Sequence, residues 1–273
     1  MKRCTLNLRN EKERGPAAVV LNPIGIPKQR FRAEKEKGKG LQEQAISLNL
    51  MMDFIIWNAR GANNASFRRQ CGAMVNIHKP ALLVLLETKM TEHQSLTKEL
   101  KFDSQIQSAA NGLSGGIVIM WNEDTLKLEN LSITPQGIHV TIKVLPNSPS
   151  WFFSAIYASP DFNTRTNLWK ELGNLSKTIA GEWLIGGDFN EVLHANDKLG
   201  GNSISHSRTS LFWSCLNECK LIDLGYKGCI YTWNNKRYRN RSSLIFERLD
   251  RCVANDSWIK FFANFVITHL PRT

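Results

Sequence analysis

The 273-residue chain lacks several patterns that would place it in a broad class of proteins. It has no run of 18 apolar residues, which excludes an ordinary transmembrane helix, and its charged N-terminus lacks the apolar stretch of a secretory signal. None of its six cysteines forms a Cys-x-x-Cys pair, and Gly200-Gly201-Asn202 lacks the spacing of a phosphate-binding glycine loop. We therefore expect neither a zinc site nor a nucleotide loop, and we interpret the cysteines as reduced thiols of an intracellular core.

Positive charge is in excess, and it is unevenly distributed along the chain. The formal net charge is +11, of which residues 1–50 contribute +6 through eleven Lys/Arg and five Asp/Glu. A basic chain attracts polyanions at long range, and nucleic acid is the commonest of these. Residues 1–51 also lack periodicity, so we predict a basic, disordered leader there. Two interpretations of this leader stay open: a loose nucleic-acid arm, or a remnant of a longer polyprotein.

Strands and helices alternate from Met52 onward, which predicts an α+β domain over residues 52–273. The expected helices span residues 65–79, 91–100, 164–179 and 207–219. The expected strands span residues 54–58, 82–86, 104–109, 116–121, 126–133, 138–144, 151–157, 183–187, 230–233, 245–253 and 261–269. So many strands with interspersed helices are best buried as two packed mixed sheets with helices outside, and the helices are too many for an up-and-down barrel.

Four of the predicted strands end in polar residues. Asn58 ends the first, Glu87 follows the second, Tyr157 ends a third, and Asp188 follows Gly186-Gly187. Ligands often bind where buried strands end. On an extended segment, residues two apart point the same way, so Asp188 and Asn190 are expected to reach into one cleft together.

These motifs, taken in order, resemble the endonuclease/exonuclease/phosphatase superfamily, and most of all the endonuclease domain of plant LINE-type retrotransposons. The motifs are Trp57-Asn58-x-Arg60-Gly61, Leu86-Glu87-Thr88-Lys89, Tyr157-x-x-Pro160, Gly186-Gly187-Asp188-Phe189-Asn190, Tyr231-Thr232-Trp233-Asn234 and Glu247-Arg248-Leu249-Asp250-Arg251. The resemblance covers residues 52–273 and implies a four-layer αββα sandwich.

The resemblance also implies the roles of individual residues. Glu87 and Asn58 would hold Mg²⁺, or Mn²⁺ in its place, and Tyr157 would donate to phosphate. Asp188 would orient or deprotonate the attacking water, and Asn190 would hold the phosphate or the aspartate. Arg60 favours phosphate and matches the LINE-type pattern.

One departure from the family pattern weakens the prediction of activity. The family carries a Ser-Asp-His motif near its C-terminus, and no Ser-Asp-His occurs in this sequence. We therefore expect the last strand of the sandwich and the catalytic imidazole to be missing. The resemblance implies that Asp250 orients that imidazole, but the motif histidine that it would orient is absent from the sequence. His269 lies in the strand expected before the motif and is a poor replacement.

Arginines and aromatic residues alternate near Trp233, with Arg237 and Arg239 as the strongest candidates for nucleic-acid contact. A solvated basic loop is the alternative there. The resemblance thus implies a Mg²⁺-dependent endonuclease acting on DNA, or on RNA, which is weak or inactive because the catalytic histidine is missing. We expect no membrane partner, and an intracellular location that is nuclear if the protein is functional. Two alternatives stay open: an inactive retroelement remnant that binds nucleic acid, and a phosphatase or phospholipid phosphodiesterase of the same fold.

Overall fold

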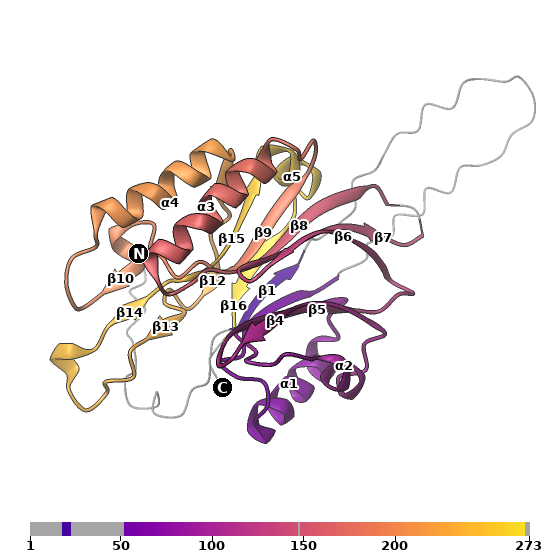
Figure 1. The fold of residues 1–273 in the computed structure, drawn as a ribbon, viewed down its shortest axis with the longest axis horizontal. Coiled ribbons are helices and arrows are strands. Elements are labelled where there is room, and N and C mark those ends of the chain that lie inside the picture. The colour runs from indigo at the N-terminus through magenta and orange to yellow at the C-terminus, as the bar shows by residue number, and fades with distance from the viewer. Residues whose placement is uncertain (1–17, 23–51, 147, 271–273) are drawn as a thin grey trace, which may run out of the picture.

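The structure is a computed structural model that describes residues 18–22, 52–146 and 148–270 (Figure 1). The α-helices are α1 (Ala65–His78), α2 (Gln94–Glu99), α3 (Phe162–Ser176), α4 (His206–Glu218) and α5 (Asp256–Phe261). The longer strands are β1 (Ala18–Asn22), β2 (Phe54–Asn58), β3 (Leu82–Leu86), β4 (Ser104–Asn111), β5 (Ser114–Trp121), β6 (Leu126–Thr134), β7 (Gly137–Val144), β8 (Ser150–Tyr157), β9 (Trp183–Asp188), β15 (Asp250–Asn255) and β16 (Val266–His269). The short strands are β10 (Lys198–Leu199), β11 (Leu221–Asp223), β12 (Lys227–Gly228), β13 (Trp233–Asn234) and β14 (Phe246–Glu247).

The larger sheet has seven strands in the order β12-β16-β1-β2-β3-β5-β4. Its central strands β2 and β3 are parallel, and every residue of both is buried. Continuous apolar runs of this kind are typical of strands that are covered on both faces. β1 lies between β16 and β2 and runs antiparallel to both.

The second large sheet has six strands in the order β11-β15-β9-β8-β7-β6. β8 and β9 are its parallel pair, whereas β6, β7 and β8 form the antiparallel meander that the sequence predicts. A small three-stranded sheet, β10-β14-β13, extends from one end of the molecule (Figure 1).

The two large sheets pack face to face, with α1 and α2 outside one sheet and α3 and α4 outside the other (Figure 1). Three apolar clusters fill the spaces between these layers. The first, around Phe54, Trp151 and Trp258, lies between the sheets. The second joins the seven-stranded sheet to α1 through Phe67, and the third joins the six-stranded sheet to α3 through Leu168. The predicted sandwich of two mixed sheets is therefore confirmed.

The sequence prediction is wrong in three local places. Helix α5, at residues 256–261, was not predicted, and the strand expected at 261–269 is shortened to β16. Asn255 caps this helix by accepting a hydrogen bond from the Trp258 N–H at 3.0 Å. The strand expected at 230–233 is reduced to β13, and the strand expected at 245–253 is divided into β14 and β15.

Residues 18–22 form a strand within the segment predicted as a disordered leader, and the rest of that segment lies outside the described residues. The boundary of the leader at residue 51 stays a prediction. None of the helices in the described ranges is long and apolar enough to cross a membrane.

Candidate active site

The site lies where two pairs of parallel strands end. Asn58 ends β2 and pairs in register with Leu86, so Glu87 follows at the same edge of the larger sheet. Tyr157 ends β8 and pairs with Asp188, the last residue of β9 in the other sheet. Because the two sheets are packed face to face, these four strand ends bring the side chains predicted from the sequence toward one cleft.

A hydrogen bond joins the two sheets directly at this cleft. The Asn58 amide nitrogen, Nδ2, donates to Asp188 Oδ2 at 2.8 Å, and both residues are about 5% exposed or less. The amide oxygen of Asn58 accepts from the Arg60 N–H at 3.1 Å. Asn58 is thus held from both ends of its amide, so its position fixes the orientation of Asp188.

The turn after β9 positions Asp188 from the other side. The Asn190 backbone N–H donates to Asp188 Oδ1 at 2.9 Å, while the Asn190 side chain donates to the Ala158 carbonyl at 2.7 Å. Asn190 has a φ of 46°, in the left-handed region, so the strand alternation ends before it. The alternation argument therefore does not apply to Asn190, and the expectation that its side chain and that of Asp188 reach into one cleft stays a prediction. Asn190 holds the aspartate through its backbone N–H.

Burial and charge set the protonation behaviour of the cleft. Burial raises the pKa of Asp188 above its ordinary value, while the hydrogen bonds from Asn190 and Asn58 and the Arg60 charge oppose this rise. Burial, together with the carboxylates of Glu87 and Asp188, raises the pKa of the Tyr157 hydroxyl. Tyr157 therefore keeps its proton at neutral pH and donates it in a hydrogen bond to Glu87.

Glu87 sits in a sharp turn, with φ values of 50° at Glu87 and 56° at Lys89. Its carboxylate lies 3.4 Å from the Lys89 Nζ, and its side chain is one-fifth exposed. Glu87 is thus in contact with Tyr157, a residue of the opposite sheet, and is open to solvent on one side. Its carboxylate can therefore exchange the lysine for another cation.

A buried network that was not predicted from the sequence holds this turn. The Thr88 hydroxyl lies 2.7 Å from His93 Nε2, and His93 Nδ1 lies 2.7 Å from the Gln107 side-chain oxygen. Burial lowers the pKa of His93, so its neutral ring donates to Gln107 and accepts from Thr88. Gly116 leaves room for Thr88, because a Cβ at Gly116 would lie 2.3 Å from the Thr88 Oγ1. The spacing of Thr88, His93 and Gln107 in the chain gives no sign of this contact.

Asp250 also belongs to the cleft, because it pairs in register with Asp188 at the start of β15. The Leu249 and Asp250 N–H groups both donate to the Thr232 hydroxyl at 3.0 Å. Thr232 is 2% exposed, so it serves as the internal anchor of the strand that presents Asp250. The motif Tyr231-Thr232-Trp233-Asn234 marks this segment in the sequence, but not the role of Thr232.

His269 is not arranged as a catalytic base. It lies in β16, donates from Nδ1 to the Cys229 carbonyl at 2.7 Å, and stacks on the Tyr226 ring with centroids 4.5 Å apart. Burial lowers the pKa of His269 to about 4. His139 is likewise engaged in the core, between Ser154 and Glu171.

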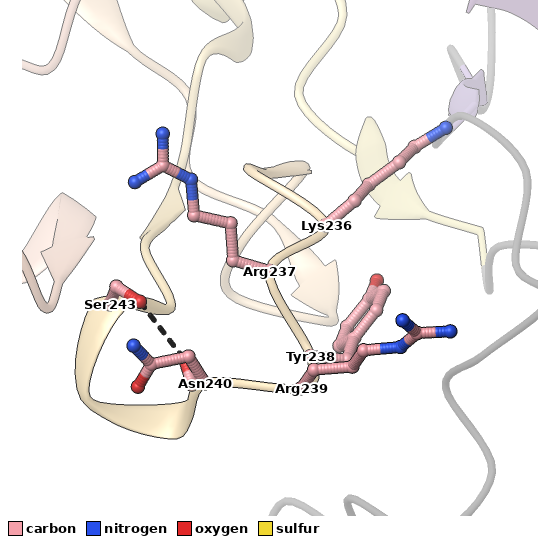
Figure 2. A pocket seen from close by; sticks show the side chains of 6 residues that line it. All are labelled: Lys236, Arg237, Tyr238, Arg239, Asn240 and Ser243. Carbon is pink, nitrogen blue, oxygen red and sulfur yellow. Dashed lines mark hydrogen bonds between the residues drawn. The ribbon is translucent and has the colours of Figure 1, made fainter.

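The predicted nucleic-acid residues fall into two groups. Arg237 and Arg239 are exposed on the loop between β13 and β14, where they line a pocket of about 540 Å³ together with Tyr238 and with Lys236, which was not predicted. Figure 2 shows the side chains of Arg237 and Arg239 extending from opposite sides of this loop.

The other two predicted contacts are away from the loop tip. Trp233 is half-buried in β13, at the base of the loop. Arg60 is not part of the loop but lies beside the acidic cleft, where its charge acts on Asp188. In the described part of the chain, no group of three or more His, Cys, Asp or Glu side chains gathers as a metal cluster.

This fold, with carboxylates, amides and a tyrosine gathered at its strand ends, is typical of the superfamily of nuclease and phosphatase hydrolases. The chain belongs to the Endonuclease/Exonuclease/phosphatase family, whose sequence profile matches residues 47–270. Among curated proteins, none matches the sequence.

Solved structures share the fold. The endonuclease domain of TRAS1, a telomere-specific non-LTR retrotransposon, is 15% identical with a TM-score of 0.51, over 71% of this chain and 81% of that one. The AP endonuclease LMAP from Leishmania major is 15% identical with a TM-score of 0.56, over 73% and 78% of the two chains. A variant of the 3' phosphatase NExo from Neisseria, bound to a product DNA hairpin, is 16% identical with a TM-score of 0.53, over 73% and 84%. At these identities, the comparison establishes the fold alone.

Proposed function

We propose that this chain carries the site of a divalent-metal-dependent endonuclease that hydrolyses phosphodiester bonds of DNA, with RNA as the alternative substrate. The observation that carries the proposal is the hydrogen bond between Asn58 and Asp188, which closes the cleft across two sheets. In the same cleft, Asn190 donates to Asp188, Tyr157 donates to Glu87, and the charge of Glu87 acts on Asp188.

Each residue has a separate role in the proposed hydrolysis. Asp188 accepts a proton from the attacking water, and its raised pKa makes it a stronger base than an ordinary aspartate. Asn58 and the Asn190 N–H keep its two oxygens oriented. Tyr157, which stays protonated, donates to a phosphate oxygen where negative charge develops.

The oxygen donors of the cleft fit a hard divalent ion. Glu87 would hold Mg²⁺ or Mn²⁺ with the help of Asn58, and the exposed side of its carboxylate supports this. One or two carboxylates suffice, because Mg²⁺ keeps several waters and takes further oxygens from substrate phosphate. The ion would neutralise charge on the phosphate.

The basic loop supports nucleic acid as the substrate class. Lys236, Arg237 and Arg239 provide exposed cations near the half-buried ring of Tyr238, a combination that meets phosphates and stacks on bases. Arg60 adds a cation beside the cleft itself. A DNA substrate implies a nuclear location for this activity.

Plasmid nicking with and without Mg²⁺ tests the proposal. We expect metal-dependent nicking that Asp188→Ala abolishes and Glu87→Gln weakens mainly through metal affinity, whereas the exposed change Lys260→Ala has no effect. DNA binding is tested separately with Arg237→Ala and Arg239→Ala, each of which should lower the slope of log affinity against log salt by about one. Nicking that is independent of both Glu87 and Asp188 would overturn the assignment.

A second function, nucleic-acid binding with little turnover, is favoured by the absence of Ser-Asp-His from these 273 residues. The buried rings of His93, His139 and His269 are each engaged elsewhere. Loss of a general acid or base lowers the rate by about 10²–10⁴. We therefore expect nicking slower by that factor than in a relative that carries the motif, while DNA binding keeps its dependence on Arg237.

A phosphatase or phospholipid phosphodiesterase of the same fold is the remaining alternative. A panel of plasmid DNA, RNA, inositol phosphates and phospholipids with one matched metal distinguishes them. A preference for inositol phosphates or for phospholipids over DNA would reject the nucleic-acid assignment.

A further inference from the structure

β1 occupies an interior position in the larger sheet, although it is short and distant in the chain from its neighbours. It forms an antiparallel ladder of four residue pairs with β16 and another of four pairs with β2. In the strand order, β2 and β16 are neighbours of β1 and not of each other. The described part of the larger sheet is therefore continuous only when β1 is in place (Figure 1).

The position that β1 fills is bounded by two backbone edges and by an apolar cluster on each face of the sheet. Without it, β2 and β16 would face each other with unpaired backbone N–H and C=O groups, which is how an edge strand accepts another strand. Val19 is 2% exposed and packs in the cluster between the sheets, whereas Val20 is 4% exposed and packs in the cluster beneath α1. This groove therefore selects an extended backbone that places compact apolar side chains on both faces.

The connection from β1 to β2 is far longer than the geometry requires. Leu21 pairs with Phe54, so the end of β1 lies beside the start of β2, where a hairpin loop of about two to five residues would suffice. Residues 23–53 separate the two strands instead. The paired contacts of β1 with both neighbouring strands, and not a short connection, therefore hold it between β2 and β16.

The groove also reaches the candidate active site. Ala18 pairs with Trp57, the residue immediately before Asn58. A strand in the groove therefore supports β2 as far as the residue that presents the bridging amide to Asp188.

We propose that the gap between β2 and β16 is a strand-binding groove, which residues 18–22 fill in the intact chain and which binds the same segment as a free peptide when the attached copy is displaced. The partner is an extended, uncharged segment with two adjacent β-branched residues, and it binds by adding its backbone to both strand edges. This inference does not depend on the proposed catalytic activity.

Hydrogen exchange on the full chain tests the first half of the proposal. We expect slow exchange at the Val19 and Val20 amides, and in the variant Val19→Asp/Val20→Asp a loss of protection of about tenfold or more in β2 and β16. The β6–β8 ladder should keep its protection in this variant. Leu113→Asp, at a side chain that is 85% exposed, is the control and should change none of these amides.

A peptide of residues 16–24, Pro-Ala-Ala-Val-Val-Leu-Asn-Pro-Ile, tests the second half. Added at millimolar concentration to the double aspartate variant, it should restore protection in β2 and β16, and a fluorescent form should bind this variant more tightly than the intact chain. The same peptide with aspartate at both valine positions should do neither. If the double aspartate variant does not fold, Val19→Ala/Val20→Ala replaces it, with the same peptide pair.

Three results would overturn the proposal. The first is exchange of the Val19 and Val20 amides at the rate of an unstructured chain. The second is unchanged protection of β2 and β16 after the valines are replaced. The third is failure of the peptide to restore that protection while the β6–β8 ladder remains folded.

Discussion

The amide of Asn58 donates to the carboxylate of Asp188 at 2.8 Å, and these two residues belong to different sheets. This contact lowers the pKa of an aspartate that burial otherwise raises. A bond between strand ends that are 130 residues apart in sequence therefore tunes the proposed base of the site.

Replacing Asn58 should alter the titration of Asp188. In Asn58→Ala the carboxylate loses one donor, so we expect the pKa of Asp188, which already lies above the ordinary aspartate value of about 3.9, to rise further. The measurement is an NMR titration of the Asp188 carboxyl carbon, which does not require turnover. Asn202→Ala, at an exposed position, should leave the curve unchanged. An unchanged titration in Asn58→Ala would mean that this amide does not act on Asp188.

The two glycines before Asp188 should respond very differently to alanine. A Cβ at Gly187, where φ is +152°, would lie 1.9 Å from the Ile156 carbonyl oxygen, so Gly187→Ala must separate β8 from β9. A Cβ at Gly186 would meet the flexible end of Ile56 at 2.3 Å, which can move aside. We expect Gly187→Ala to cost about 4 kcal/mol of unfolding free energy or more, and Gly186→Ala about 1–3 kcal/mol, measured by urea denaturation. Equal costs would contradict the predicted backbone clash.

Thr232 should contribute to the free energy of unfolding through its hydroxyl oxygen and not through its shape. Thr232→Val leaves the Leu249 and Asp250 N–H groups buried without their acceptor, at about 1–3 kcal/mol for each unpaired group. Thr232→Ser keeps the oxygen and should cost about 1 kcal/mol or less. Urea denaturation of the two variants compares them, and a serine variant as unstable as the valine variant would reject this role.

The stability of the fold should fall in acid partly through His269. Burial lowers its pKa to about 4, whereas an unfolded histidine titrates near 6.5, so the unfolded chain binds the extra proton between these values. The contribution of His269 to the free energy of unfolding is therefore fully present above about pH 6.5. It is lost as the pH falls toward 4, by up to about 3 kcal/mol.

His269→Phe isolates this contribution, because it preserves a ring against Tyr226 and cannot be protonated. Unfolding free energies at pH 7 and pH 4.5 should differ less in this variant than in the original chain. The pKa of His93 is also lowered by burial, and it acts in the same direction in both proteins, so it cancels in the comparison. An identical pH dependence in the two proteins would show that His269 does not contribute.

Much of the fold could be predicted from the sequence because local signals were strong. The apolar runs 54–58 and 82–86 are buried strands ending at polar residues, and their parallel pairing brings Asn58 and Glu87 to one edge. Tyr157 and Asp188 were likewise expected at strand ends, and the parallel pairing of β8 with β9 brings them side by side. In each case the polar residue follows its strand directly, so the strand position fixes the residue position.

The rest depended on contacts or dihedral angles that a linear pattern does not contain. Helix α5 was not predicted, because a helix of six residues is too short to show a helical pattern of apolar residues, and only the Asn255 cap indicates it. The left-handed φ of Asn190 ended the alternation that aligned it with Asp188. The pairing of β1 with β16 joins segments from opposite ends of the chain, and no local preference predicts such a pairing.

Asp188 stands between Tyr157 on one neighbouring strand and Asp250 on the other. Side chains alternate between the faces of a strand, so a slip of β9 by one residue would turn the carboxylate out of the cleft and toward α3. Such a slip would also exchange Leu184 and Ile185 between the two apolar clusters that β9 separates. The packing of both interiors and the direction of the Asp188 carboxylate therefore depend on the same alignment of this one strand.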